Sequence, residues 1–598
     1  MEKDISLDSF SGSLTNNNGK KSETPIAIEL AKKQRDISVA EFFEKNRHLL
    51  GFDNKKKALL TTIKEAVDNS LDACEEADIL PEIVVEIIDM STSEIPDRFK
   101  IIVEDNGPGI VKEQIPSIFA KLLYGSKFHR LKQSRGQQGL GISASVMYAQ
   151  LTTGKPAKII SKISPSHPAH YVELMLDTAT NKPKILKTEI VEWSKDHGTK
   201  VEIDLEGSYA KGSQSVDEYL RNTAIVNPHT TIIYQPSSGS QIMFIRATEE
   251  KPAQPKEIKP HPYGIELGTF LKMLERTEYR TLQAFLTNEF SRVGAGTAKE
   301  ICENSATLPT TPPKKISREM AEKIVEGIKK TKIMNPPTDC IVPIGKELIE
   351  KGIKKEIHAE FYASATRPPF VYRGNPFVIE AALAYGGNLP AEDSMKILRF
   401  ANRVPLLYQQ GACAITSSIT KTNWRQYGLK QSSNSVPIGP CVIIVHMGSV
   451  WVPYTSEAKE AIAHYPEIIK EIKLALQECG RELGKYLNKK RRVNQELKKV
   501  DYITKYLPHV GIALQELLKL DDKEKARLEE NLKEILESTR DIPTLESADN
   551  GEIEDSEGMG FSVGDDNDSD DDSPDDDNSG DDSDEEPEDD SEGGEDNE

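Results

Sequence analysis

Three short segments in a fixed order constrain the fold of this 598-residue chain more than any other feature. The segment KEAVDNSLDA at residues 64–73 has apolar residues at helical spacing. VEDNGPGI at residues 103–110 ends an apolar run in an aspartate and a glycine turn, and SRGQQGLGIS at residues 134–143 is a glycine-rich loop before a helix. A helix, a strand with a turn and a loop that opens a second helix predict a domain in which helices pack on a sheet.

The first segment places a polar stripe on a helix predicted from Lys55 to about Ala77. Glu65, Asn69 and Asp72 stand at positions i, i+4 and i+7, which share one helix face. An Asn amide oxygen suits Mg²⁺ that also binds phosphate, and a neighbouring Glu can orient or deprotonate water as a general base. Taken alone, the stripe also fits a solvated helix face.

The other two segments supply a carboxylate and a loop of glycines. Asp105 ends a predicted strand, and Gly107 and Gly109 permit a turn with positive φ, so a buried Asp105 can accept a hydrogen bond from an adenine amino group. The free N–H groups where GQQGLGIS opens a helix favour phosphate. An ordinary Asn-Gly turn and a lone GxxGxG loop are the alternatives that these segments leave open. The glycines of the loop are Gly136, Gly139 and Gly141.

Periodicity along the chain predicts several domains, as expected for its length. Strand-like segments after the first long helix predict an α/β sandwich whose mostly antiparallel sheet carries helices on one face. Two long C-terminal helices are expected, at about 456–485 and 502–520. The predicted parts are a flexible arm (1–37), a first α/β domain (38–255), a helical module (256–332), a second α/β domain (333–487), a helical segment (488–540) and a disordered acidic tail (541–598).

Two pairs of residues have the spacing of a capping box at a helix start. The pairs are Ser38 with Glu41 and Thr297 with Glu300. In a capping box the first side chain accepts from the backbone N–H of the glutamate, and the glutamate side chain accepts from the backbone N–H of the first residue. These pairs predict that Ser38 and Thr297 are N-cap residues.

Charge is segregated along the chain. The net charge is −21, but 27 of the 97 acidic residues lie in residues 546–598, which contain no Lys or Arg; the remaining 70 acidic and 76 basic residues give the rest a net charge of about +6. This basic balance is compatible with a nucleic-acid partner. The run KKRR at residues 489–492 is a candidate for phosphate contacts, with a solvated helix face as the alternative. The acidic tail cannot bury enough apolar surface to fold.

Cysteine usage and hydropathy exclude two classes of protein. The six cysteines are scattered, without the spacing of a zinc site or a disulfide framework. No run of about 18 apolar residues appears, and the N-terminal segment has no apolar signal core. We therefore expect a cytoplasmic protein that does not enter a membrane.

Together with HGTKVEI at residues 197–203, the three segments resemble the motifs of the Bergerat (GHKL) ATP-binding fold of gyrase, heat-shock chaperones, histidine kinases and MutL-type repair proteins. The resemblance implies ATP and Mg²⁺ as cofactors, Glu65 as the catalytic base and Asn69 as the metal ligand. The nucleotide-binding residues that it implies are Asn69, Asp105, Gly107, Gly109, Ser126, Lys127, Gly136, Gln137, Gln138, Gly139, Leu140, Gly141, Ile142, Ser143 and Thr199.

Longer stretches resemble one family within this superfamily. SVAEFFEKNRHLLGFD, LLYGSKFH, PHPYGIEL and VPYTSEAKEAIA look like the B subunits of DNA topoisomerase VI, the archaeal type IIB enzyme, over roughly residues 38–487. The resemblance implies a multidomain α+β fold with a GHKL ATPase α/β sandwich, a helix-two-turn-helix module and a transducer domain of ribosomal-protein-S5-like fold. It also implies that Lys430, in NWRQYGLKQ, reaches the γ-phosphate; an ordinary surface lysine is the alternative.

The function implied by this resemblance is that of the ATP-hydrolysing subunit of a type II DNA topoisomerase. ATP binding would dimerise two copies and gate passage of double-stranded DNA, which relaxes supercoils and decatenates DNA. Cleavage would be left to a partner A subunit with a catalytic tyrosine, in an A2B2 heterotetramer. Two alternatives remain: an ATP-driven clamp or chaperone of the same superfamily, and a DNA-binding module whose ATP motifs are vestigial.

Overall fold

The computed structural model describes most of the chain apart from its two ends. The acidic tail at 541–598 and the loop residues Gln137 and Gln138 lie outside the described residues, so their predictions stay predictions. Within the predicted flexible arm, one short helix is described, α1 (Ile26–Ala31). The described residues are 26–31, 34, 36–127, 130–136, 139–456, 458–519 and 521–539.

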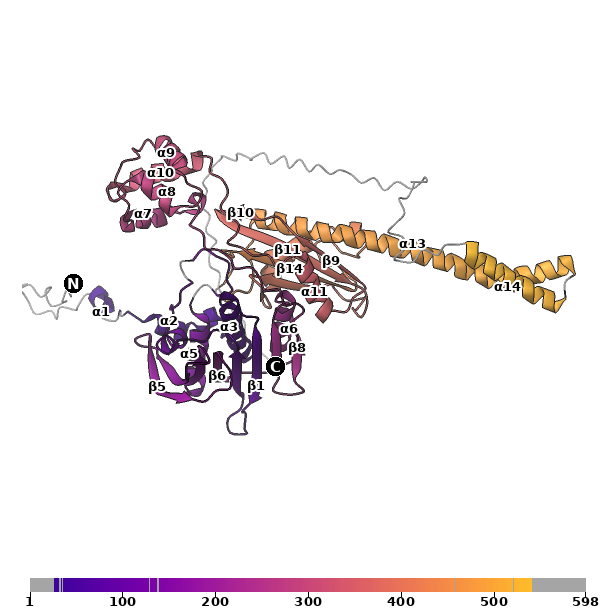
Figure 1. The fold of residues 1–598 in the computed structure, drawn as a ribbon, viewed down its shortest axis with the longest axis horizontal. Coiled ribbons are helices and arrows are strands. Elements are labelled where there is room, and N and C mark those ends of the chain that lie inside the picture. Colours follow the sequence, from indigo (N-terminus) through magenta and orange to yellow (C-terminus); the bar gives the residue numbers. More distant parts are fainter. Residues whose placement is uncertain are drawn as a thin grey trace, which may run out of the picture. The chain divides into compact units, whose positions relative to one another are not determined.

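The first α/β domain is built on one eight-stranded sheet (Figure 1). Its strands are β1 (Glu82–Asp89), β2 (Arg98–Asp105), β3 (Ala157–Lys162), β4 (Ala169–Asp177), β5 (Lys182–Val191), β6 (Gly198–Glu206), β7 (Thr231–Gln235) and β8 (Ile242–Phe244). Their order is β5-β4-β3-β6-β2-β1-β7-β8, in which β1 and β7 run parallel and the other neighbours antiparallel. Buried residues alternate along β2 and β6, as expected when one face of a sheet is packed. The predicted mostly antiparallel sheet is confirmed.

The helices of this domain bury apolar residues against the sheet. They are α2 (Val39–Lys45), α3 (Lys55–Glu76), α4 (Ile115–Phe119), α5 (Gly141–Thr153) and α6 (Val216–Val226), with a 3₁₀ helix at Arg47–Leu50. Ser38 caps α2 as predicted, because its Oγ accepts from the Glu41 N–H at 3.0 Å. Leu59, Ile63 and Val67 of α3 lie fully in the core at helical spacing, which confirms the predicted long helix and turns the opposite face toward the site described below.

Four helices form the part of the chain predicted as a helical module. They are α7 (Leu267–Arg276), α8 (Leu282–Glu289), α9 (Ala295–Asn304) and α10 (Arg318–Lys330), and they pack around Phe270, Phe285 and Phe290. The prediction that Thr297 is an N-cap is wrong, since α9 begins at Ala295 with Gly294 at the N-cap. Val293 and Ala298 are both buried in the core of the module, and this packing favours a helix that begins before Thr297.

The second α/β domain has a sheet that is buried on both faces. Its strands are β9 (Phe361–Thr366), β10 (Phe370–Tyr372), β11 (Asn375–Tyr385), β12 (Lys396–Ala401), β13 (Val404–Pro405) and β14 (Cys441–Ser449), in the order β10-β11-β14-β12-β13 with β9 beside β11. Every residue of β14 is buried. Helices α11 (Lys346–Glu356) and α12 (Ala414–Thr420) belong to the two packed layers.

A single 53-residue helix, α13 (Pro466–Leu518), follows this sheet, and α14 (Asp522–Thr539) comes after it (Figure 1). The prediction of two helices at 456–485 and 502–520 is wrong. The predicted domain boundary at 487 falls inside α13. Charged residues on successive turns keep the helix intact: Glu496 pairs with Lys499, and Asp501 with Lys505. The helix starts ten residues later than predicted because Tyr465, which precedes Pro466, is extended.

The two α/β domains pack directly on each other. Ile225 and Val226 at the end of α6 share a core with Ile349 and Ile353 of α11. A Cβ at Gly352 would lie 2.0 Å from the Ile225 carbonyl oxygen, so the two helices approach as closely as glycine permits. In the part of the chain that the structure describes, no helix has the length and apolar character needed to cross a membrane.

Candidate nucleotide-binding site

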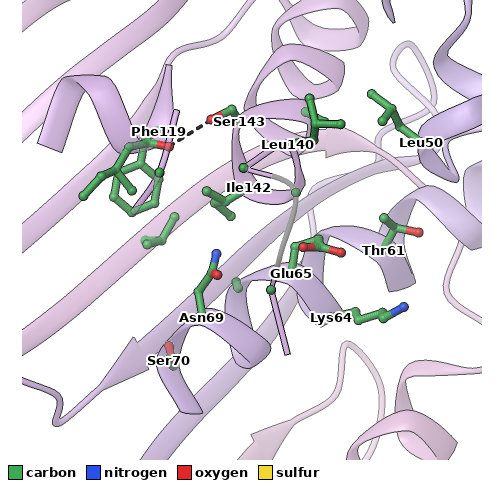
Figure 2. Close-up of a pocket in the computed structure, with 18 of the residues that line it drawn as sticks. Leu50, Thr61, Lys64, Glu65, Asn69, Ser70, Phe119, Leu140, Ile142 and Ser143 are labelled. Atoms are coloured by element: carbon green, nitrogen blue, oxygen red, sulfur yellow. Dashed lines mark hydrogen bonds between the residues drawn. The ribbon is translucent and has the colours of Figure 1, made fainter. Parts of the chain in front are cut away.

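A cavity of about 590 Å³ brings the three sequence segments together. Its walls come from α3, the end of β2, the loop before α5 and the first turn of α5, with further residues from the second α/β domain. Figure 2 shows Glu65 and Asn69 on α3 facing Leu140 and Ile142 at the start of α5. The cavity therefore joins an acid, an amide and a helix N-terminus.

Glu65 lies directly against the glycine-rich loop. A Cβ on Gly141 would fall 1.8 Å from Glu65 Oε2, so only glycine leaves room for the carboxylate at this position. Asn69, one helical turn further along α3, is exposed to the cavity. Among the described residues, no group of three or more His, Cys, Asp or Glu side chains is arranged to hold a metal ion. A divalent ion here would be held by Asn69 together with oxygens of a bound ligand and of water.

Asp105 is buried beneath the cavity and is tightly hydrogen-bonded. Its Oδ1 accepts from the N–H groups of Gly107 at 2.9 Å and Thr199 at 3.0 Å, and its Oδ2 accepts from Ser70 Oγ at 2.8 Å. Burial raises the pKa of Asp105, and these three donors offset part of that effect. The turn that follows requires glycine at Gly109, where φ is +72° and a Cβ would lie 2.1 Å from the Lys162 carbonyl oxygen.

The start of α5 presents backbone donors to the cavity. Its N-cap, Leu140, makes no side-chain capping bond, and the first N–H groups of any helix lack partners within the helix. Gly141, Ile142 and Ser143 line the cavity here. Ser143 Oγ is already committed, because it donates to the Ile118 carbonyl at 2.9 Å or the Lys121 carbonyl at 3.1 Å. An anion at this point would meet the positive end of the helix dipole.

Lys127 reaches the cavity but is paired with an acid of α3. Its Nζ lies 2.6 Å from Asp72 Oδ2, and Arg135 lies 2.9 Å from Asp72 Oδ1. Burial by itself would raise the pKa of Asp72, but the two cations outweigh it and hold the pKa below its usual range. Asp72 thus anchors the chain at Lys127 and at Arg135, both on the N-terminal side of the loop glycines, while Ser126 and Gly136 line the cavity nearby.

The structure does not bring Lys430 to the cavity. Lys430 is exposed, and its carbonyl oxygen accepts from the Ile438 N–H at 2.8 Å in a separate loop. The lysine of the second α/β domain that does line the cavity is Lys459, which is 7 % exposed and donates from Nζ to the Arg135 carbonyl at 2.9 Å. The spacing of NWRQYGLKQ contains no information about which loop folds against the glycine-rich segment, so sequence reasoning could not select Lys459.

Two further charged residues were missed in the sequence. Arg135 is 3 % exposed in its side chain and donates to Asp72, Glu75 and Asn227. Asp68, between Glu65 and Asn69, is buried; its Oδ1 accepts from Tyr219 OH at 2.9 Å. No motif distinguishes either residue. Asp68, however, is one of four acid or amide residues within eight positions of a long helix, and such a cluster is a reason to inspect each of its members.

Asp68 leads to a prediction about stability and pH. Burial raises its pKa to about 6 from an ordinary 3.8, although Lys64 acts in the opposite direction. The folded state therefore holds this proton more tightly than the unfolded state, so the stabilisation is present at low pH and is lost as pH rises from about 4 to about 6. Over that range wild-type unfolding free energy should fall by about 3 kcal/mol relative to Asp68→Asn, at about 1.4 kcal/mol per pKa unit. Urea titrations of both proteins at several pH values measure this, and parallel curves would contradict it.

Comparisons with known proteins agree with this arrangement. Residues 54–206 match the family of histidine kinase-, DNA gyrase B- and HSP90-like ATPases, and residues 336–499 match the transducer of the topoisomerase VI B subunit. The chain is 54% identical over 498 residues to the B subunit of type 2 DNA topoisomerase 6 from Methanococcoides burtonii, which covers 83% of this chain and 79% of that protein. The corresponding protein of Methanosarcina mazei is 53% identical over 500 residues (83% and 80%), and that of Archaeoglobus fulgidus 48% over 500 residues (83% and 82%).

Proposed function

Since this chain belongs to the family of type 2 DNA topoisomerase 6 B subunits, we propose that it binds and hydrolyses ATP in the cavity to drive passage of one DNA duplex through another. The observation that carries the proposal is the contact between the Glu65 carboxylate and Gly141 at the N-terminus of α5. It holds a general base beside a set of backbone donors that favour phosphate. Asn69, one turn away, completes a site that a triphosphate with a divalent ion would fill.

Each part of the nucleotide has a partner in this proposal. Asp105 accepts from the adenine amino group beside Thr199, and the N–H groups at Gly139, Gly141 and the following residues hold the phosphates. Asn69 offers its amide oxygen to Mg²⁺, which neutralises charge on the phosphate oxygens when bound. The described residues fit such an ion because it prefers a few protein oxygens together with phosphates and water.

The proposed reaction is hydrolysis at the γ-phosphate. Glu65 accepts a proton from a water molecule as the water oxygen forms a bond to the γ-phosphorus, and the bond from that phosphorus to the β–γ bridging oxygen breaks. ADP and inorganic phosphate are the products. Lys459, in place of Lys430, contacts the γ-phosphate and stabilises the charge that develops there. Because Lys459 belongs to the second α/β domain, the loss of phosphate would change a contact between domains.

Replacing Asn69 with alanine should weaken Mg²⁺-dependent nucleotide binding. The variant removes one oxygen ligand from the ion and leaves the apolar face of α3 unchanged. We expect at least about a tenfold loss of affinity for a non-hydrolysable ATP analogue, equal to about 1.4 kcal/mol, by isothermal titration calorimetry. With a chelator in place of Mg²⁺, wild type and variant should bind equally. An unchanged affinity in the presence of Mg²⁺ would remove Asn69 from the metal site.

The family, the exposed apolar side chains and the basic residues of this chain support a proposal for its partners. We propose an A2B2 heterotetramer in the cytoplasm, in which ATP dimerises two copies of this chain and the A subunit supplies the cleavage tyrosine. The A subunit would dock on exposed apolar side chains of α13 and α14. The most exposed of these are Tyr502, Tyr506, Leu517, Leu518 and Ile535. Double-stranded DNA would contact the helical module and Arg491 and Arg492, which makes binding sensitive to salt.

Relaxation of supercoiled DNA tests the proposed function directly. The full chain is purified with the A-type subunit encoded by the same source and is incubated with supercoiled plasmid, Mg²⁺ and ATP. Relaxation that requires both subunits and ATP supports the proposal. Relaxation without ATP, or hydrolysis of ATP with no effect on plasmid topology in the presence of both subunits, would contradict it.

A further inference from the structure

The three residues before the glycine-rich loop, residues 133–135, are held from two sides, and we call them the loop stem. On the first side, Arg135 donates to Asp72 at 2.9 Å, to Glu75 at 2.7 Å and to Asn227 at 2.6 Å. All four side chains are buried or half-buried. The first α/β domain therefore holds one side of the stem through a network of charged side chains that is largely shielded from solvent.

On its other side, each residue of the stem is hydrogen-bonded to the second α/β domain. The Gln133 N–H donates to the Cys340 carbonyl at 2.9 Å, and Gln133 Oε1 accepts from the Val342 N–H at 2.7 Å. The Arg135 carbonyl accepts from Lys459 Nζ at 2.9 Å. The phosphate-binding loop is thus continuous with a segment that both domains hold.

Asn402 supplies the bond to the middle residue of the stem. Its Nδ2 donates to the Ser134 carbonyl at 3.0 Å and also to the Ser449 carbonyl at 2.9 Å, while its Oδ1 accepts from the Ser449 N–H at 2.8 Å. Because one of its partners donates a hydrogen bond and the other two accept one, the oxygen and the nitrogen of the Asn402 carboxamide are assigned by these bonds. The side chain pairs with the end of β14 as a neighbouring strand would, and it extends that pairing to the stem.

The position of Asn402 is itself rigid. The residue is 2 % exposed, and its own N–H donates to the Met447 carbonyl at 2.8 Å. Its φ is 47°, a left-handed conformation that Asn adopts more readily than most residues. A side chain that is buried, fully bonded and on a constrained turn cannot follow the stem without also moving β14, because an unsatisfied buried carbonyl would result.

We infer that Asn402 is a positioning residue that links the conformation of the glycine-rich loop to the sheet of the second α/β domain. The inference rests on the proposed function, since it assigns to the loop a nucleotide whose binding and hydrolysis displace it. Lys459 lines the cavity at one end of this connection, whereas Asn402 is not among the residues that line it. Nucleotide state would reach β14 through Ser134, Asn402 and Ser449 in that order.

The test compares Asn402→Asp with Asn434→Asp. Asp at 402 keeps the acceptor for the Ser449 N–H but replaces a donor by an oxygen that faces two carbonyls. Asn434 is a matched control because it is exposed, lies in the same domain and has a φ of 52°. Cysteines placed at exposed Glu192 and Arg481 carry spin labels on the full chain, and the native cysteines are buried. The distance distribution is measured with and without a non-hydrolysable ATP analogue and Mg²⁺.

Wild type and Asn434→Asp should both change their distance distribution when the analogue binds. Asn402→Asp should bind the analogue within about threefold of wild type, a difference of about 0.7 kcal/mol, yet lose that change. A full change in Asn402→Asp would overturn the inference and leave the proposed function intact. A wild-type chain that binds no analogue would instead overturn the proposed function and the inference together.

A second variant keeps the test decisive if Asn402→Asp lowers the melting temperature too far. Gln133→Met removes the acceptor for the Val342 N–H at the adjacent residue of the stem and preserves side-chain length. The nucleotide-dependent change in distance should be lost, as in Asn402→Asp. A folded Gln133→Met protein with a wild-type response would show that the stem does not transmit the change.

Discussion

Replacing Glu65 with glutamine should nearly abolish ATP hydrolysis while nucleotide binding stays intact. The two side chains have the same shape, so the contact with Gly141 at the start of α5 is retained and the phosphate donors stay in place. Only the ability to accept a proton from water is lost. Removal of a general base lowers turnover by about 10² to 10⁴-fold, and we expect a loss of that size in steady-state phosphate release.

A matched control lies on the same helix. Glu76 is near the end of α3, has a side chain that is 41% exposed and pairs with Lys132 at 3.2 Å outside the cavity. Glu76→Gln makes the identical chemical change and should hydrolyse ATP at the wild-type rate. Affinity for a non-hydrolysable analogue should be equal in all three proteins. Rapid turnover by Glu65→Gln would assign the base to another group.

Replacing Lys459 with alanine should slow hydrolysis strongly, whereas the same change at Lys430 should have little effect. Lys459 is buried at the cavity, where a cation interacts with phosphate at low dielectric, whereas Lys430 is exposed and does not line the cavity. Loss of one donor that stabilises developing charge costs about 10² to 10³-fold in turnover. Both variants remove the same side chain, so the comparison isolates position.

The backbone does not confound this comparison. Lys459 has a φ of 54°, in the left-handed region. Alanine has a Cβ, as lysine does, so the substitution leaves the backbone strain at this position unchanged. Circular dichroism and melting temperature check that both variants fold. Equal loss of turnover in Lys430→Ala and Lys459→Ala would contradict the assignment drawn from the cavity and return Lys430 to the site.

Local patterns predicted the elements that carry the site. The helical spacing in residues 55–77 predicted α3 to within one residue of its end, and the alternation after it predicted β1 and β2. Gly109 was informative for a local reason, because its φ of +72° lies in a region that favours glycine and such a turn is visible in a short stretch of sequence. The overlaps that a side chain would make with the Lys162 carbonyl at Gly109 and with the Glu65 carboxylate at Gly141 involve residues distant in sequence, so only the structure reveals them.

Local patterns failed in the long C-terminal helix. Two helices were predicted at about 456–485 and 502–520, but the charged residues between them have good helix propensity and pair on successive turns. The helix α13 therefore continues through residues 466–518 without interruption. The capping prediction at Thr297 failed in a similar way, because burial of residues on both sides outweighed a favourable local spacing.

The sequence by itself predicted the helix that carries Glu65 and Asn69, the strand and turn at Asp105 and the glycine-rich helix start, because each of these elements depends on contacts within a helix, a turn or a helix start. Only the tertiary structure decided what closes the pocket. Lys459 meets the Arg135 carbonyl across 324 residues of sequence, and Asn402 meets Ser134 across 268. Such contacts depend on how two sheets pack, as at Gly352 against Ile225, and no local periodicity records that packing.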